Sequence, residues 1–294
     1  MSSQVEGVIL KGIGGFYYVH TGTRQIECKA GGRLRLNRRE KPAVGDRVMV
    51  EERGEEGLIT QILPRKNFLQ RPPIANIDQL FIVASQASPV TDPYLIDKVS
   101  VIALRQGIQP ILVLNKQDVD PSQDFRAIYE KAGFPVLSTS AETGEGVEQL
   151  RQMLHGKVSA FTGNSGIGKS SLLNRLEEGV LMETGSISRI SRGRHTTRRV
   201  ELFFVADGYL ADTPGFSSFD ISRMEHIPKE ELEQYFPEFE PFLGQCRFSG
   251  CAHCKEPDCA VDQGAREGAI APSRLESYRK LYEEMAQWKE WENK

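Results

Sequence analysis

Residues 163–170 read GNSGIGKS, and they follow a short apolar run at residues 157–161. The run predicts a strand. A glycine-rich loop after a strand can turn its backbone N–H groups toward a polyphosphate, with Lys169 reaching the terminal phosphates and Ser170 offering a hydroxyl to magnesium. A helix expected from about Lys169 adds the positive end of its dipole at the same point. By itself, the pattern also fits a glycine-rich turn.

A second motif lies upstream, where residues 115–118 read NKQD directly after the apolar run 110–114. The Asp118 carboxylate can accept hydrogen bonds from the ring N–H and the exocyclic amine of guanine, a pair of donors that adenine lacks. Ligand groups of a parallel sheet lie at the carboxyl ends of its strands, which is where this motif falls. The sequence STSA at 138–141 repeats the placement and predicts a second, weaker base contact from the backbone near Ala141.

A third motif lies downstream, where residues 212–215 read DTPG after the apolar residues 209–211. Asp212 can hold magnesium through water, and the N–H of Gly215 can sense the γ-phosphate. The three motifs together predict GTP as the ligand. Its predicted contacts are Asn115, Lys116, Asp118, Ser140, Ala141, Gly163, Asn164, Ser165, Gly166, Ile167, Gly168, Lys169, Ser170, Ser171, Asp212 and Gly215.

The order of these motifs is rotated. In an ordinary guanine-nucleotide switch protein the phosphate loop comes first and NKxD comes near the end, whereas here NKQD precedes the phosphate loop. Strand-like and helix-like runs alternate between about residues 70 and 220, as in an α/β nucleotide-binding domain. The same parts joined in rotated sequence indicate a circularly permuted GTPase.

A family resemblance covers nearly the whole chain. The motifs NKxD, GxSGxGKSSL, GRHTT at 193–197, DTPGF and Cys-x4-Cys-x-His-x5-Cys follow one another here as they do in the ribosome small-subunit-dependent GTPase A family, also called the RsgA, YloQ or YjeQ type. The resemblance implies a multidomain α/β protein with an N-terminal OB-fold β-barrel, a circularly permuted P-loop GTPase domain and a C-terminal zinc-binding and helical domain. It also implies a role in late maturation of the small ribosomal subunit, with GTP hydrolysis that is slow alone and faster on the subunit.

The expected domain boundaries are 1–66, 67–221 and 222–294. Five short β-like runs with glycine punctuation fill the first domain and suit a small barrel, and the prolines at 72 and 73 predict a linker after it. Between the third and fourth runs, residues 29–41 form a glycine-containing basic loop of the kind with which OB-folds hold nucleic acid. A solvated loop without a ligand is the alternative.

The residue that orients the attacking water is not marked by the usual motif. Many GTPases carry a glutamine right after DxxG to orient the attacking water, but this chain has Phe216, whose ring can neither donate nor accept. His195, in the basic segment 188–199, is predicted to place the water, and the resemblance implies the same role; contact with RNA is the alternative. Either Thr196 or Thr197 is expected to be the second magnesium ligand beside Ser170, with Thr197 preferred.

Four of the five cysteines lie between residues 246 and 259. In a reducing compartment that density indicates a metal site, and three thiolates with one imidazole give a closed, structural zinc centre. If the local chain is extended, Cys251 and His253 project to one side and Cys254 to the other, which selects Cys246, Cys251, His253 and Cys259. The resemblance implies the same set, and a four-cysteine site is the alternative.

A final helix is predicted from Pro272, with a capping-box pattern at Ser273 and Glu276. Its apolar stripe, which includes Leu275, Tyr278 and Leu281, predicts packing onto the zinc module or the GTPase domain, and a partner surface is the alternative.

The net charge of −3 excludes a uniformly basic nucleic-acid binder, so RNA contacts must come from local patches. No signal segment or membrane span is recognisable, and a monomeric cytoplasmic protein is expected, with GTP or GDP and the small ribosomal subunit and its rRNA as partners. Two other functions stay open. One is an RNA-binding assembly chaperone in which GTP only locks a conformation, and the other is an ATP-dependent kinase, which would leave Asp118 without donors.

Overall fold

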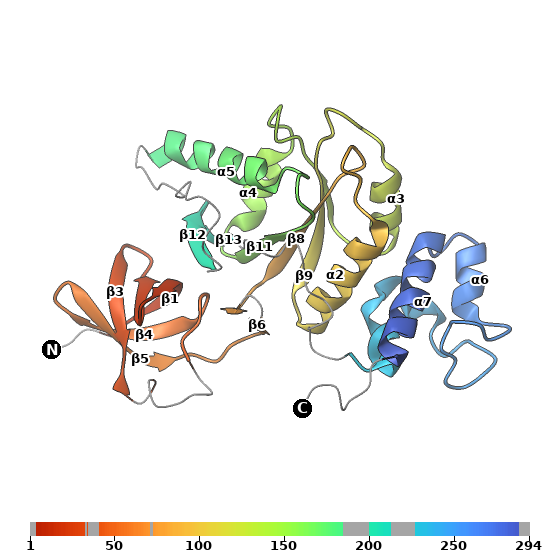
Figure 1. Cartoon of the computed structure of the whole chain (residues 1–294), viewed down its shortest axis with the longest axis horizontal. Coiled ribbons are helices and arrows are strands. Elements are labelled where there is room, and N and C mark those ends of the chain that lie inside the picture. Colours follow the sequence, from red (N-terminus) through yellow and green to blue (C-terminus); the bar gives the residue numbers. More distant parts are fainter. Residues whose placement is uncertain are drawn as a thin grey trace.

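The computed structural model describes residues 4–32, 34, 41–70, 73–184, 200–212 and 227–287 of the chain, and within them the side chains of residues 177–184 and 212 are not described. A β-barrel, a sheet covered by helices and a group of C-terminal helices follow one another from the N-terminal to the C-terminal part (Figure 1). This arrangement confirms the predicted fold class.

The barrel is built from β1 (Gln4–Ile13), β2 (Phe16–His20), β3 (Gln25–Ala30), β4 (Arg47–Arg53) and β5 (Glu56–Ile62). Its strand order is β1-β2-β3-β5-β4, and antiparallel pairing of β1 with β4 closes it. Alternate residues along each strand point inward, so that a small apolar core forms around Ile9, Val19 and Ile59. Cys28 belongs to this core, as expected of a packed apolar side chain.

A short hairpin stands where the sequence predicted a linker. It consists of β6 (Phe68–Gln70) and β7 (Pro73–Ala75), and Pro73 is tolerated because it is the first residue of its strand. The Asn76 side chain fastens the hairpin to the barrel by accepting from the N–H of Lys66 at 2.8 Å and donating to the carbonyl of Gly45 at 2.9 Å. The linker prediction was therefore wrong for residue 73, because proline marks a strand start as readily as a flexible join.

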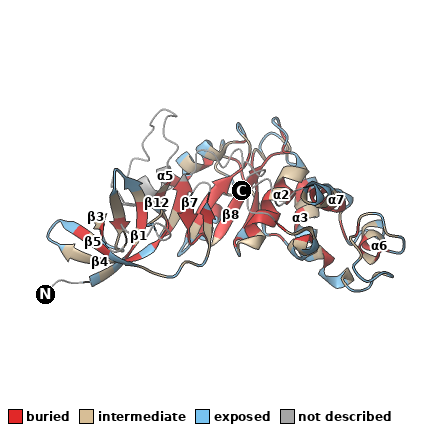
Figure 2. Ribbon diagram, turned by 60° about the horizontal axis from the view of Figure 1, so that its bottom comes forward, coloured by how far each residue is buried: buried red, intermediate tan, exposed pale blue. Residues whose placement is uncertain are grey.

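The central sheet has the order β10-β9-β8-β11-β13-β12, and every neighbouring pair is parallel except β12 with β13. Its strands are β8 (Gln79–Ala84), β9 (Gln109–Leu114), β10 (Val136–Ser138), β11 (Val158–Thr162), β12 (Glu201–Val205) and β13 (Gly208–Asp212). The sheet is thus mixed, and the predicted α/β nucleotide-binding domain is confirmed. All six residues of β8 are buried, as expected for the middle of a parallel sheet (Figure 2).

Helices cover both faces of this sheet. Ile96, Val99 and Ala103 of α2 (Pro93–Arg105) join one apolar core with the buried residues of α3 (Asp124–Lys131). The buried apolar residues of α4 (Val147–Leu154) and the described ones of α5 (Lys169–Thr184) join the other. Asp92 caps α2 by accepting a 2.9 Å hydrogen bond from the N–H of Tyr94.

The C-terminal part contains η3 (Lys229–Tyr235), η4 (Pro237–Phe242), α6 (Ala260–Arg266) and α7 (Pro272–Ala286). The apolar stripe of α7 is buried in one core with η3, η4, α6 and Val101 of α2, which confirms the packing interpretation. The capping box is not formed: α7 begins after Ala271, has Pro272 in its first turn and lacks a side-chain cap.

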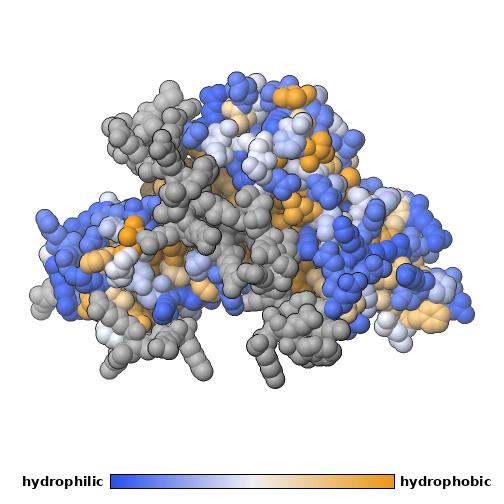
Figure 3. Space-filling model, viewed as in Figure 1, coloured by the Kyte–Doolittle hydropathy of each residue, from blue (hydrophilic) through white to orange (hydrophobic). Residues whose placement is uncertain are grey.

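Hydrophilic side chains cover much of the described surface seen in Figure 3, and apolar residues are exposed there in small, separate patches. Among the described residues, no helix is both long enough and apolar enough to cross a membrane.

Candidate nucleotide and metal sites

The carboxyl ends of β8, β9, β10 and β11 lie side by side along one edge of the sheet. Cα partners in the register join Ser138 with Leu114 and Leu114 with Ala84, and Thr162 pairs with Ile82. The predicted base-reading segments and the phosphate loop, which leave β9, β10 and β11, therefore emerge at the same edge.

Two glycines of the phosphate loop are required by space as well as by backbone conformation. Gly163 has φ +138°, and a Cβ there would lie 2.3 Å from the carbonyl oxygen of Val83. At Gly168, with φ +94°, a Cβ would lie 2.2 Å from Nδ2 of Asn115. The loop is thus pressed against the strand beside it and against the base-reading motif.

Lys169 closes the loop at the start of α5. Its Nζ donates to the carbonyls of Gly163 at 2.6 Å and Asn164 at 2.5 Å. Burial lowers the pKa of this lysine. Two neutral carbonyls are weaker acceptors for an ammonium than phosphate oxygens, so the side chain is placed to turn from them to a polyphosphate. Ser170 and Ser171 are exposed in the first turn of the same helix.

Asn115 links the base-reading segments to the phosphate loop. Its side chain is buried, with Nδ2 donating to the carbonyl of Ile167 at 2.8 Å. Oδ1 accepts from the Thr139 hydroxyl at 3.2 Å and from the N–H of Ala141 at 3.1 Å. One side chain therefore joins three segments that were predicted to contact the same ligand.

Asp118 and Ser140 are also brought together. The Ser140 hydroxyl donates to Oδ1 of Asp118 at 2.5 Å and accepts from the N–H of Thr143 at 3.1 Å. This contact holds the carboxylate that is predicted to read guanine. The N–H of Ala141, the predicted second base contact, already donates to Asn115, so a base oxygen would have to share it.

Lys116 contacts the loop that follows β8. It has a left-handed backbone, with φ +68°, and its Nζ donates to the carbonyl of Ser88 at 2.7 Å. The same loop meets the phosphate loop, because a Cβ on Gly166 would lie 3.6 Å from Cγ of Pro89. The segment 85–92 is thus a further wall of the site, and no sequence motif marked it.

Several predicted residues cannot be placed. His195, Thr197 and Gly215 lie outside the described residues, as does most of the basic loop 29–41. The backbone of Asp212 ends β13 beside the phosphate-loop strand, where Ala160 pairs with Ala211, but its side chain is not described.

The barrel contacts β12 and β13, the two strands that border these undescribed segments. Lys11 Nζ donates to Glu201 Oε1 at 2.9 Å, and the Tyr209 hydroxyl lies 2.9 Å from Nδ1 of His20. The ring of Phe204 packs on the same imidazole, with 4.4 Å between the ring centroids. No motif or spacing predicted this contact, because its partners are about 190 residues apart in the sequence.

The predicted zinc ligands form one cluster. Ligand atoms of Cys246, Cys251, His253 and Cys259 all lie within 4.8 Å of one another. His253 Nδ1 is 3.6 Å from Cys246 Sγ and 3.3 Å from Cys259 Sγ, and these two sulfurs are 3.9 Å apart. Ligands at zinc bond lengths in a tetrahedron are about 3.4–3.8 Å apart, so the cluster fits one structural zinc ion.

Neighbouring groups hold these ligands. His253 is buried, and Glu233 Oε2 lies 3.0 Å from its Nε2, which leaves Nδ1 to face the metal. Glu256 accepts from the N–H groups of Ala252, Cys254 and Lys255 at 3.0 to 3.2 Å. The carboxylate of Glu256 thereby fixes the turn that carries His253.

The ligand set was predicted correctly, but the geometric reason was wrong. His253 has φ +57°, so the chain is left-handed at this residue and not extended. Cys254 stays outside the ligand cluster and packs against the C-terminal apolar core, where burial raises the pKa of its thiol to about 11. The four-cysteine alternative is therefore not supported.

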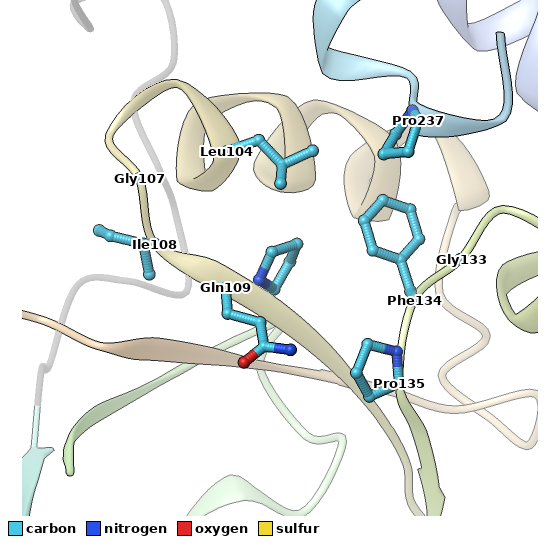
Figure 4. A pocket seen from close by; sticks show the side chains of 9 residues that line it. Leu104, Gly107, Ile108, Gln109, Gly133, Phe134, Pro135 and Pro237 are labelled. Atoms are coloured by element: carbon cyan, nitrogen blue, oxygen red, sulfur yellow. The ribbon is translucent and has the colours of Figure 1, made fainter. Parts of the chain in front are cut away.

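A separate pocket of about 370 Å³ lies at the start of β9. Leu104 of α2, Phe134 before β10 and Pro237 of η4 are among its lining residues (Figure 4). Asn115 follows the other end of β9, so this apolar pocket is not part of the predicted nucleotide site.

Comparison with known proteins agrees with this geometry. The family model for the RsgA GTPase matches residues 62–222, and the model for the RsgA N-terminal domain matches residues 6–59. A relative named small ribosomal subunit biogenesis GTPase RsgA, from Caldanaerobacter subterraneus subsp. tengcongensis, is 45% identical over 289 residues and is covered to 96%, as is this chain.

Two solved structures share the whole arrangement. YjeQ from Thermotoga maritima superposes with a TM-score of 0.80 at 34% identity, over 98% of this chain and 100% of that one. YloQ, described as a circularly permuted GTPase, gives a TM-score of 0.81 at 33% identity, over 98% and 96% of the two chains. The chain therefore belongs to the RsgA family of circularly permuted GTPases.

Proposed function

We propose that this protein binds the small ribosomal subunit late in its maturation and hydrolyses GTP there, faster on the subunit than alone. The proposal assigns guanine reading to Asp118, with Asn115, Lys116, Ser140 and Ala141 forming its pocket. The observation that carries it is the Asn115 side chain, which joins the base-reading segments to the phosphate loop. A site of that shape is suited to a ligand with a base at one end and phosphates at the other.

Residues 163–171 hold the phosphates in this proposal, and Lys169 exchanges its two carbonyl acceptors for phosphate oxygens. Ser170 and Thr197 hold magnesium, Asp212 does so through water, and Gly215 reads the γ-phosphate. When bound, magnesium supplies charge neutralisation at the β- and γ-phosphates. His195 then positions the attacking water, because Phe216 offers no polar group.

In this proposal the chain has three functional units, with boundaries at residues 66 and 221. They are an RNA-binding barrel, the GTPase domain and the zinc-bearing helical domain. RNA contact is assigned to the basic loop 29–41 and to the basic segment 188–199, which concentrate positive charge in a chain of net charge −3. The relatives' name supports the small subunit as partner. We assign the protein to the cytoplasm, as a monomer.

Phosphate release from GTP and from ATP, with and without purified small ribosomal subunits, tests the proposal. GTP-selective release that rises with subunits is expected, and Lys169→Ala serves as the blank. Release from ATP would refute the assignment of Asp118. GTP binding without any rise in turnover would favour an assembly chaperone in which GTP only locks a conformation, a second reading that Phe216 keeps open.

A further inference from the structure

Arg175 contacts the base-reading loop from the helix that carries the phosphate loop. It lies on α5, six positions after Lys169, and its guanidinium donates from Nε to the carbonyl of Ala141 at 2.9 Å. Nη2 of the same side chain donates to the carbonyl of Glu142 at 2.6 Å. A planar fork that binds two successive carbonyls fixes both the position and the tilt of the loop.

The loop held in this way carries two of the groups assigned to guanine. Ala141 offers its backbone N–H, and Ser140 holds the Asp118 carboxylate. Two hydrogen bonds tie the loop 140–145 together, from the N–H of Ser140 to the carbonyl of Glu145 and from the N–H of Gly144 to the carbonyl of Ser140. A displacement at Ala141 would therefore be passed on to Ser140 and to Asp118.

We infer that Arg175 is a positioning residue for guanine recognition. It ties the loop 140–145 to the helix that follows the phosphate loop, while Asn115 links the same loop to the phosphate loop from the buried side. The role rests on the two hydrogen bonds from Arg175 to the loop and on no contact with the nucleotide. The inference rests on the proposed GTP site, and it adds a determinant of base selectivity that none of the motifs contains.

The alternative is that Arg175 merely stabilises α5 and the phosphate loop. The two roles differ in their dependence on the base. If the role is structural, removal of Arg175 should weaken the binding of every nucleoside diphosphate alike. If Arg175 positions the loop, its removal should weaken the binding of GDP and IDP, which share the 6-oxo group, and leave the binding of ADP, which lacks that group, unchanged.

The test uses the full-length protein and displacement of a fluorescent GDP analogue by GDP, IDP and ADP. For Arg175→Ala we expect about tenfold weaker GDP and IDP binding, as the loss of two charge-assisted hydrogen bonds predicts, and less than about twofold change for ADP. Arg175→Lys, which can still donate to one carbonyl, should recover part of the loss.

Arg126→Ala is the matched control. Arg126 also contacts the segment before the loop, donating to the Ser138 hydroxyl at 2.9 Å, but it does not hold residues 141–142 in the described contacts. Its removal should leave the preference for GDP over ADP unchanged. Amide hydrogen exchange without nucleotide gives a second measurement: Arg175→Ala should accelerate exchange at residues 140–145 and not at 163–168.

The inference would be overturned if Arg175→Ala weakened the binding of all three nucleotides equally, or if it accelerated amide hydrogen exchange in the phosphate loop. Unchanged affinities in Arg175→Ala would overturn it as well. Failure of the proposed function looks different, because the unmodified protein would then show no preference for GDP over ADP at all.

Discussion

Arg274 of α7 donates from Nη1 to Oδ1 of Asp97 on α2 at 2.7 Å, and both side chains are excluded from solvent. Glu238 of η4 accepts from the same guanidinium at 2.6 and 3.1 Å, and the ring of Phe236 lies 4.5 Å from its central carbon. Burial alone would lower the pKa of Arg274, but the two carboxylates outweigh it and raise that pKa. The zinc-bearing part is therefore fastened to the sheet domain by a buried ionic group.

Arg274→Met is expected to lower the free energy of unfolding by about 3–5 kcal/mol, because Asp97 and Glu238 would stay buried without their cation. Urea unfolding followed by tryptophan fluorescence and circular dichroism measures this. The triple variant that adds Asp97→Asn and Glu238→Gln should recover part of the loss. A single Arg274→Met change costing under about 1 kcal/mol, the usual range for an exposed pair such as Arg266 with Asp262, would contradict the argument.

Zinc stoichiometry should separate Cys254 from the three other cysteines of its region. Cys259→Ser removes a ligand and is expected to yield protein with far less than one bound zinc, whereas Cys254→Ser should keep the full amount because its sulfur is outside the cluster. Metal analysis after gel filtration gives the number directly. Zinc loss in Cys254→Ser with retention in Cys259→Ser would reverse the assignment. Glu233→Gln, which changes only the group beside His253, should weaken zinc binding by about 10- to 100-fold.

Much of the site could be predicted from the sequence because its residues are local. A strand, a glycine-rich loop and a helix follow one another within residues 158–184, and NKQD directly follows its own strand. Local order of this kind fixes which groups reach the carboxyl edge of the sheet. The spacing of Cys246, Cys251, His253 and Cys259 likewise restricted the choice of ligands, even though the left-handed backbone at His253 was not foreseen.

What could not be predicted depends on partners that are distant in the sequence. Arg274 lies within the first turn of α7, where a hydropathy pattern places arginine in solvent. Its burial is tolerable only because Asp97, 177 positions earlier, and Glu238, 36 positions earlier, pair with it. Arg175 is exposed on α5, and nothing near it in the sequence announces the carbonyls that it binds. Contacts of this sort have no local period or spacing from which to infer them.

The contact between the barrel and the sheet should weaken in acid. Burial lowers the pKa of His20 from 6.5, so the unfolded chain takes up the proton first and stability falls as the pH drops below about 6.5. The groups around the imidazole are Tyr209, Phe204 and, near them, the pair of Lys11 with Glu201. His20→Asn can still accept from the Tyr209 hydroxyl but does not titrate. Its melting temperature should therefore change less between pH 7.5 and 5.5 than that of the unmodified protein, and an identical change in both would refute the assignment.

Subunit-stimulated turnover should depend on His195 if this residue positions the attacking water. His195→Ala is expected to reduce stimulated GTP hydrolysis by about 100-fold or more while GDP affinity stays the same, because general-base and positioning effects act on the chemical step. Single-turnover phosphate release on saturating subunits measures that step. A drop in subunit binding with normal turnover once bound would instead assign His195 to the RNA contact.

Gly168 is pressed against Asn115, so this position does not tolerate a side chain. A methyl group at this position would lie 2.2 Å from Nδ2 of Asn115 and would push that amide away from the carbonyl of Ile167. Gly168→Ala should therefore distort both the phosphate loop and the base-reading loop. The affinity for a fluorescent GDP analogue is expected to fall by at least about 100-fold, because two or more hydrogen bonds are lost and the backbone is strained.

Gly133→Ala controls for the strained backbone alone. Gly133 has φ +83°, close to the +94° of Gly168, but a Cβ there meets no atom within 4 Å. The two variants should then share a modest loss of stability of about 1 kcal/mol from the left-handed conformation, and only Gly168→Ala should lose GDP. If both variants bound GDP normally, the Asn115 bridge would not be the element that holds the base-reading segments and the phosphate loop together. The bridge is made by one buried side chain, that of Asn115. The Gly168→Ala change displaces this side chain by adding a methyl group beside it and deletes no atom of the site, so it tests directly whether the bridge couples the two halves.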